Sequence, residues 1–93
     1  MQTPRGDIEI ELATIQAEVV RAENKHAPMN SAHEGYAVLL EEVRELEAEV
    51  FKGGRIPRDW AAMHSEAVEV AAMAVRLIRD VIKPAIAASD GSS

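Results

Sequence analysis

Four glutamates stand in two pairs that share one spacing. Glu42 and Glu45 are three residues apart, and Glu66 and Glu69 repeat that interval further along the chain. Residues three apart lie on one face of a helix, so each pair presents two carboxylates in the same direction. If two antiparallel helices carry the pairs, the four carboxylates come within reach of one another and repel. Mg²⁺, or Mn²⁺ in its place, relieves that repulsion because it binds carboxylate oxygens.

A magnesium site of this kind indicates phosphate chemistry. A bound Mg²⁺ bridges phosphate oxygens, lowers the pKa of a bound water and stabilises charge on a leaving pyrophosphate. Glu41 adjoins the first pair and can accept the proton of that water as the catalytic base. Glutamate is also a favoured helix former, and on spacing alone the competing interpretation of each glutamate is a solvated helix face.

Capping residues predict three helices that position these glutamates. Asp7 is expected to cap the first helix. Ser31 and Glu34 form a capping box at the start of the second, in which each side chain binds the other residue's backbone N–H. Asp59 can cap the third, just after Pro57. Together with the apolar periodicity, these signals predict helices over about residues 7–25, 32–52 and 58–83.

Prolines and glycines are predicted to separate these helices. Pro28 interrupts the first helical pattern, since proline donates no backbone hydrogen bond. Gly53 and Gly54 mark the end of the second helix, and Pro84 is expected to end the third. We expect one domain over residues 1–88 and a flexible tail over 89–93.

Composition favours helix-on-helix packing. The 93 residues are 47% apolar but only 3% aromatic, so Ala, Val, Leu, Ile and Met must build the core. The expected fold class is therefore all-α, an antiparallel helical bundle. A chain of this length leaves much apolar surface in water, and the apolar positions of the third helix cover more than one face. We therefore expect homo-oligomerisation to complete the bundle.

Charge and hydropathy exclude several classes of function. The formal charge of −6 argues against binding of a nucleic acid polymer, which requires neutralisation of phosphates. With no cysteine, the chain has no disulfide framework and no thiolate nucleophile. No segment approaches the ~18 apolar residues of a membrane span, and no signal peptide is recognisable. We expect a cytoplasmic protein without a membrane partner.

The two acidic motifs resemble those of a known enzyme family. The run Glu41-Glu42-Val43-Arg44-Glu45, followed by Glu66-Ala67-Val68-Glu69, is similar to the EExxE and ExxD pair of the MazG-like all-α nucleoside triphosphate pyrophosphohydrolases. The resemblance extends over HEGYAVLLEEVRELEAEV and SEAVEVAAMAVRLIRDV, as in the short phage and bacterial members. It implies hydrolysis of a nucleoside triphosphate to the monophosphate and pyrophosphate, by a homodimer or homotetramer.

The resemblance also implies roles for single residues. Glu42, Glu45, Glu66 and Glu69 become the metal ligands, and Glu41 becomes the additional acidic residue that ligates the metal or activates water. Position 69 departs from the family pattern, which has aspartate there. The extra methylene of Glu69 moves its carboxylate outward.

Three further residues are candidates for substrate binding. Arg76 and Asp80 lie on the same stripe of the third helix as the acidic pair, where Arg76 can receive a phosphate. A salt bridge from Arg76 to Asp80 or to Glu69 is an equal alternative. Lys52 lies beside the glycine turn, where it either reaches phosphates or compensates the helix dipole.

Two functions without catalysis compete with hydrolysis. In the first, the chain is a helical interaction module whose acidic stripe only keeps it in solution. In the second, it binds nucleotides without cleaving them and acts as a sensor.

Overall fold

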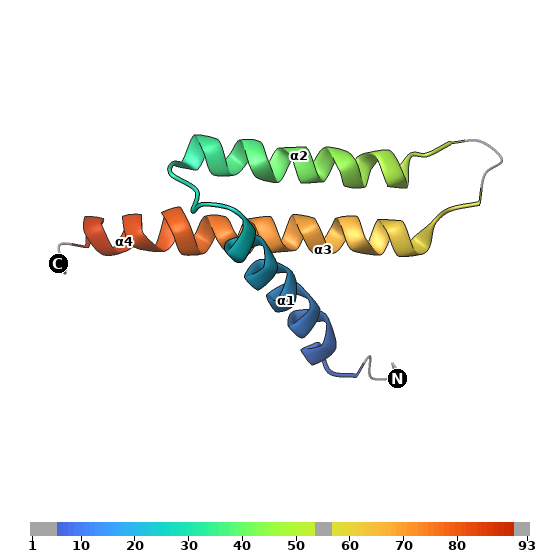
Figure 1. The fold of residues 1–93 in the computed structure, drawn as a ribbon, viewed down its shortest axis with the longest axis horizontal. Helices are drawn as coiled ribbons and strands as arrows, with labels where there is room; N and C mark the ends of the chain where they lie inside the picture. Colours follow the sequence, from blue (N-terminus) through green and yellow to red (C-terminus); the bar gives the residue numbers. More distant parts are fainter. Residues whose placement is uncertain (1–5, 54–56, 91–93) are drawn as a thin grey trace, which may run out of the picture.

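The computed structural model describes residues 6–53 and 57–90, and every regular element among them is helical (Figure 1). The elements in chain order are α1 (Glu9–Lys25), α2 (Ala32–Val50), α3 (Trp60–Leu77), the π-helix η1 (Ile78–Ile82) and α4 (Lys83–Ser89). The predicted all-α fold is confirmed. Gly54 and most of the predicted tail, residues 91–93, lie outside the described residues.

The long α3 helix is the central element. α2 runs antiparallel beside it, α1 crosses it at a steep angle, and η1 and α4 continue its axis (Figure 1). Both α1 and α2 pack against α3, which explains why apolar residues cover more than one face of that helix. The predicted second and third helices are therefore antiparallel neighbours, as the acidic pairs require.

Two of the predicted helix caps are present. The Asp59 carboxylate accepts a hydrogen bond from the Ala62 N–H at 2.9 Å, and the Ser31 hydroxyl accepts one from the Glu34 N–H at 3.1 Å. The second half of the capping box differs from the prediction. Glu34 accepts its hydrogen bond from the Asn30 N–H at 2.7 Å, one residue before the cap, and so binds the end of the α1–α2 connector.

The predicted cap of the first helix is wrong. Ile8 occupies the N-cap position of α1, and no side chain among the described residues forms a capping hydrogen bond there; the helix begins two residues after Asp7. At the other boundary, α2 ends at Val50, two residues before the predicted end.

Pro84 does not end the third helix, contrary to the prediction. The chain widens into η1, where the Lys83 N–H donates to the Ile78 carbonyl five residues earlier. α4 then begins with proline in its first turn, a position that needs no N–H donor. The wider π turn relieves the clash between the proline ring and the preceding turn, so the helix continues to Ser89.

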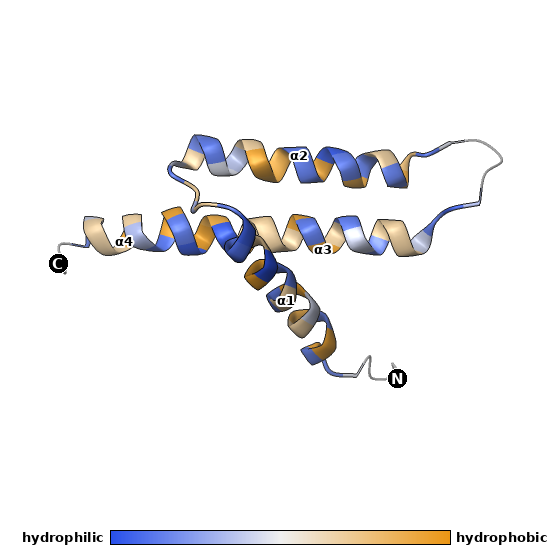
Figure 2. Ribbon diagram, viewed as in Figure 1, coloured by the Kyte–Doolittle hydropathy of each residue, from blue (hydrophilic) through white to orange (hydrophobic). Residues whose placement is uncertain are grey.

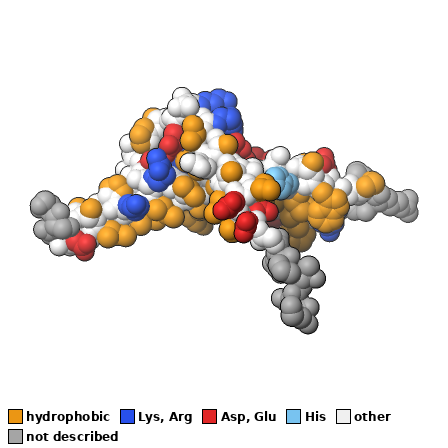
Figure 3. Space-filling model, turned by 90° about the horizontal axis from the view of Figure 1, so that it is seen from below, with side chains coloured by type: hydrophobic (Ala, Val, Ile, Leu, Met, Phe, Trp, Pro, Cys, Tyr) orange, Lys and Arg blue, Asp and Glu red, His pale blue; other side chains and the backbone are white. Residues whose placement is uncertain are grey.

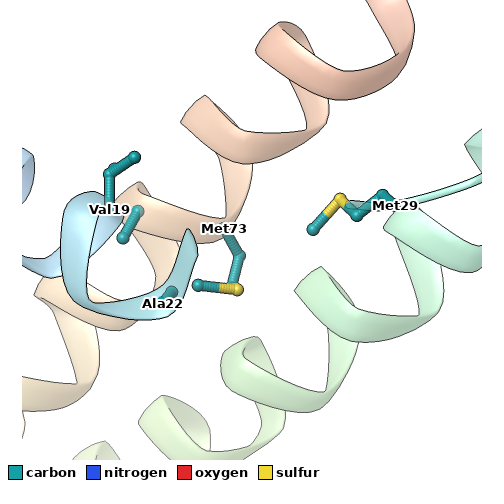
Figure 4. Packing of buried hydrophobic residues seen from close by; sticks show 5 residues of the cluster. Val19, Ala22, Met29 and Met73 are labelled. Atoms are coloured by element: carbon teal, nitrogen blue, oxygen red, sulfur yellow. The ribbon is translucent and has the colours of Figure 1, made fainter. Parts of the chain in front are cut away.

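The hydrophobic core of the described chain is small. It lies where α1, the α1–α2 connector and α3 meet, with Met73 facing Ala22 and Met29 beside the same space (Figure 4). Its five buried members are Val19, Ala22, Met29, Ala72 and Met73.

Many apolar side chains remain on the surface. Tyr36 and Val43 of α2 are 60% and 39% exposed. Hydrophobic and hydrophilic residues alternate along α1 and α2 (Figure 2), and one face of the molecule shows hydrophobic side chains over much of its length (Figure 3). None of the helices in residues 6–53 and 57–90 has the length and apolar character of a membrane span.

Candidate metal centre

Three carboxylates gather on one side of α2. Glu41, Glu42 and Glu45 can each direct one oxygen so that all three oxygens lie within 4.8 Å of one another. Glu41 and Glu45 are exposed, whereas Glu42 is partly buried toward the neighbouring helices. The helical spacing predicted from the sequence produces this cluster, because positions i, i+1 and i+4 lie on adjoining parts of one face.

Glu66 of α3 adds a carboxylate beside Glu45 of α2. Its Oε2 atom is buried and has no hydrogen-bond partner among the described residues. Burial raises the pKa of Glu66, and repulsion from Glu45, a hydrogen bond from protonated Glu66 to Glu45 and repulsion from Glu49 raise it further. The first pair and the second pair therefore meet across the α2–α3 interface.

Glu42 lies among carboxylates from all three long helices. Burial is the largest cause of its raised pKa, followed by repulsion from Glu45 and Glu66, and then from Glu41 and Glu18. Burial and repulsion from these carboxylates both favour the neutral form of Glu42 unless a cation compensates.

Glu69 is the most strongly perturbed carboxylate of the site. Its pKa is raised to about 7, first by burial, then by a hydrogen bond and repulsion involving Glu18, and then by repulsion from Glu42. The Arg21 guanidinium, 3.5 Å from Glu69 Oε1, opposes these effects. Arg21 is closer to Glu18 than to Glu69. Its hydrogen bond to Glu18 is the largest cause of the lowered pKa of Glu18.

Glu18 belongs to the site but was missed in the sequence analysis. It lies on α1, outside both acidic motifs, and reaches Glu69 only because α1 crosses α3 at this point. The one indication near Glu18 in the sequence is Arg21, three residues later. That signal indicates an ordinary helical ion pair and does not point to a carboxylate of another helix.

Lys52 lies away from the cavity residues and pairs with Glu49 of the preceding turn. Its Nζ atom is 3.2 Å from Glu49 Oε1. Glu49 in turn repels Glu66, so Lys52 neutralises a carboxylate at the edge of the cluster.

Arg76 is buried, with 4% exposure, and fixes the α1–α2 connector onto α3. Its Nη2 donates to the Ala27 carbonyl at 3.0 Å, and its Nη1 lies 3.6 Å from the Met73 sulfur. One helical turn later, the Asp80 carboxylate accepts a hydrogen bond from the Met29 N–H at 3.0 Å. Arg76 forms no ion pair with Asp80 or Glu69 in the described part of the chain.

A cavity of about 420 Å³ joins these groups. Glu41, Glu42 and Glu69 line it together with Glu18, Arg21 and Arg76, and connector residues 26–30 form another part of the wall. This volume lies within the range of pockets that hold small molecules. The predicted base, two predicted metal ligands and one predicted substrate residue therefore share one cavity.

The residues present fit a hard divalent cation. All the candidate donors are carboxylate oxygens, several of them withdrawn from water, and Glu66 Oε2 is a buried acceptor without a donor. Oxygen donors of this type suit Mg²⁺ and Mn²⁺ and disfavour softer metals. Comparison of the chain with protein-family models, curated proteins and solved structures found no match. The functional assignment therefore depends on the residues of the site itself.

Proposed function

We propose that the protein is a magnesium-dependent nucleotide pyrophosphohydrolase, which cleaves a ribo- or deoxyribonucleoside triphosphate to the monophosphate and pyrophosphate. The observation that carries the proposal is the gathering of Glu42, Glu45, Glu66 and Glu69 at one helix junction, where the pKa values of Glu42, Glu66 and Glu69 are raised. Such an arrangement costs folding free energy unless a cation binds. The MazG-like motifs of the sequence support the same reaction.

The four glutamates would hold Mg²⁺, for which Mn²⁺ can substitute. When bound, the metal supplies charge neutralisation for phosphate oxygens and a lowered pKa for a bound water. Glu41 is exposed at the wall of the cavity, and its carboxylate takes the proton of the attacking water. Arg76 of α3 and Asp80 of η1 hold the connector in place and so shape the cavity that receives the nucleotide.

We also propose that the protein works as a homo-oligomer. The described residues bury only five hydrophobic side chains and leave eleven large ones exposed, so much apolar surface is available for contact with a second copy. Exposed isoleucines at Ile78, Ile82 and Ile86 recur every four residues along η1 and α4 and supply one apolar stripe for a second copy.

The same exposed apolar surface favours one competing function. A helical interaction module would use this surface to bind a partner and would need no metal. The two functions differ in one inexpensive measurement, because a cation that binds only the folded state raises the melting temperature. A pyrophosphohydrolase is stabilised by Mg²⁺ or Mn²⁺, and an interaction module is not.

Pyrophosphate release from a panel of nucleoside triphosphates tests the proposal. Wild type should release pyrophosphate from at least one nucleotide in the presence of Mg²⁺ and none in EDTA. Glu42→Gln should abolish release, because it removes a partly buried carboxylate of the cluster. Glu47→Gln, on an exposed part of the same helix, is the matched control and should keep full activity. No release by wild type, or full release by Glu42→Gln, excludes the proposed reaction; binding of nucleotides without turnover identifies a sensor.

A further inference from the structure

Arg21 connects carboxylates from two helices at the edge of the candidate metal centre. Its Nε and Nη2 atoms donate to the two Glu18 oxygens at 3.0 and 2.5 Å, so the guanidinium lies against that carboxylate in a fork geometry. The same Nη2 is 3.5 Å from Glu69 Oε1. Glu18 belongs to α1 and Glu69 to α3, so this cation crosses the junction between the two helices.

Arg21 lines two cavities. The 420 Å³ cavity with the carboxylates of α2 lies on one side, and a more open cavity of about 730 Å³, which reaches His64 and Ser65, lies on the other. Glu18, Arg21 and Glu69 are the residues that line both of them. A phosphate chain bound in either cavity would therefore lie against a wall to which Arg21 contributes.

Arg76, the other arginine of the smaller cavity, is largely occupied by contacts within the protein. It is buried, and both of its Nη atoms contact the connector or the Met73 sulfur, which leaves its buried Nε as the one nitrogen of this guanidinium without a hydrogen-bond partner among the described residues. The Arg21 side chain is 57% exposed, and its Nη1 has no hydrogen-bond partner among the described residues. Arginine binds phosphate through two parallel N–H donors, so an exposed guanidinium with a free nitrogen is the better phosphate ligand.

We propose that Arg21, not Arg76, binds the phosphate chain of the substrate. The inference rests on the proposed function, since it assigns the residue that receives the triphosphate. The guanidinium partly offsets the charge of Glu69 at 3.5 Å, and if Glu69 held a cation, Arg21 would be available to the phosphates. Glu18 keeps the guanidinium oriented by its paired hydrogen bonds throughout. Arg21 also supplies the positive charge that an anionic substrate needs among these carboxylates.

Binding of inorganic tripolyphosphate tests this role without knowledge of the base. Its affinity is measured by calorimetry in the presence of Mg²⁺, with wild type, Arg21→Gln and Arg21→Lys. Loss of a charged hydrogen-bond donor should weaken binding by roughly tenfold or more in Arg21→Gln. Arg21→Lys, which keeps the charge but loses the fork, should lie between it and wild type. Mn²⁺ alone should bind Arg21→Gln at least as tightly as wild type, because the competing cation has gone.

Arg79→Gln is the matched control. Arg79 has the same 57% exposure and forms an ion pair with Glu23 of α1 at 2.9 Å, but it does not line the carboxylate cavity. It should bind tripolyphosphate as wild type does. Equal affinity of Arg21→Gln and wild type, or an equal loss in Arg79→Gln, overturns the Arg21 assignment; if wild type still releases pyrophosphate, the proposed function stands. If wild type neither binds tripolyphosphate nor releases pyrophosphate, both proposals are wrong.

Discussion

Glu18 of α1 and Glu69 of α3 lie close enough for protonated Glu69 to donate a hydrogen bond to the Glu18 carboxylate. The two residues are fifty-one positions apart, and no motif connects them. Their proximity makes the protonation of Glu69 part of the stability of the fold. It also places a further carboxylate beside those of the acidic motifs.

Folding stability in EDTA should fall as the pH rises from about 4.5 to about 7. Glu69 has a pKa of about 7 in the folded chain against an ordinary value of 4.5, so the folded state binds the extra proton in this window. Glu69→Gln cannot ionise and should be more stable than wild type at pH 8, by on the order of 1 to 2 kcal/mol. Urea unfolding between pH 5 and pH 8 measures both effects. If the folding stability of Glu69→Gln fell with pH as steeply as that of wild type, Glu69 would not be the source of the pH dependence.

Glu66→Gln should change stability in opposite directions with and without metal. In EDTA the variant should be more stable than wild type by up to about 1 kcal/mol, because an amide at this partly buried position avoids an unpaired charge beside Glu45. In millimolar Mn²⁺ it should lose most of the metal-induced rise in melting temperature that wild type shows. Thermal unfolding in both buffers measures the difference. A full metal response in Glu66→Gln would remove this residue from the metal site.

Arg76→Ala should destabilise the chain by about 2 to 4 kcal/mol even without substrate. The substitution leaves the Ala27 carbonyl without its donor and opens space beside Met73 in the small core. Arg79→Ala, which removes an exposed ion pair, should cost less than ~1 kcal/mol and serves as the control. Denaturant unfolding measures the loss of stability in each of the two variants. Equal losses of stability in the two variants would mean that the burial and contacts of Arg76 contribute nothing to stability beyond those of an exposed arginine.

Ile86→Asp should lower the oligomeric state. Ile86 is 55% exposed on the apolar stripe of η1 and α4, and a carboxylate there cannot enter an apolar interface. Ala88→Asp adds the same charge about 200° around the helix and should leave the assembly intact. Light scattering coupled to size-exclusion chromatography reports the mass of each. A wild type that is already monomeric at micromolar concentration would refute the proposed homo-oligomer.

Local patterns in the sequence were sufficient for the helices and for part of the site. The capping oxygens of Ser31 and Asp59, and the three-residue spacing of the glutamates, act within a single turn of helix, so their effects can be read from neighbouring residues. The all-α fold class followed from the composition and from the apolar periodicity of the helices. The cluster of Glu41, Glu42 and Glu45 lies within two turns of α2 and was accessible in the same way.

Contacts between distant segments were decided only by the tertiary structure. The steep crossing of α1 over α3 brings Glu18 to Glu69, and the fold of the connector turns Arg76 inward to the Ala27 carbonyl, forty-nine residues away. Helical periodicity assigns a residue to a face but does not state which neighbour covers that face. Pro84 shows the same limit at short range, because a π turn allowed the helix to continue where the local rule predicted its end. The sequence thus determined the helices and the acidic motifs, whereas the packing angle between helices decided which other groups complete the site.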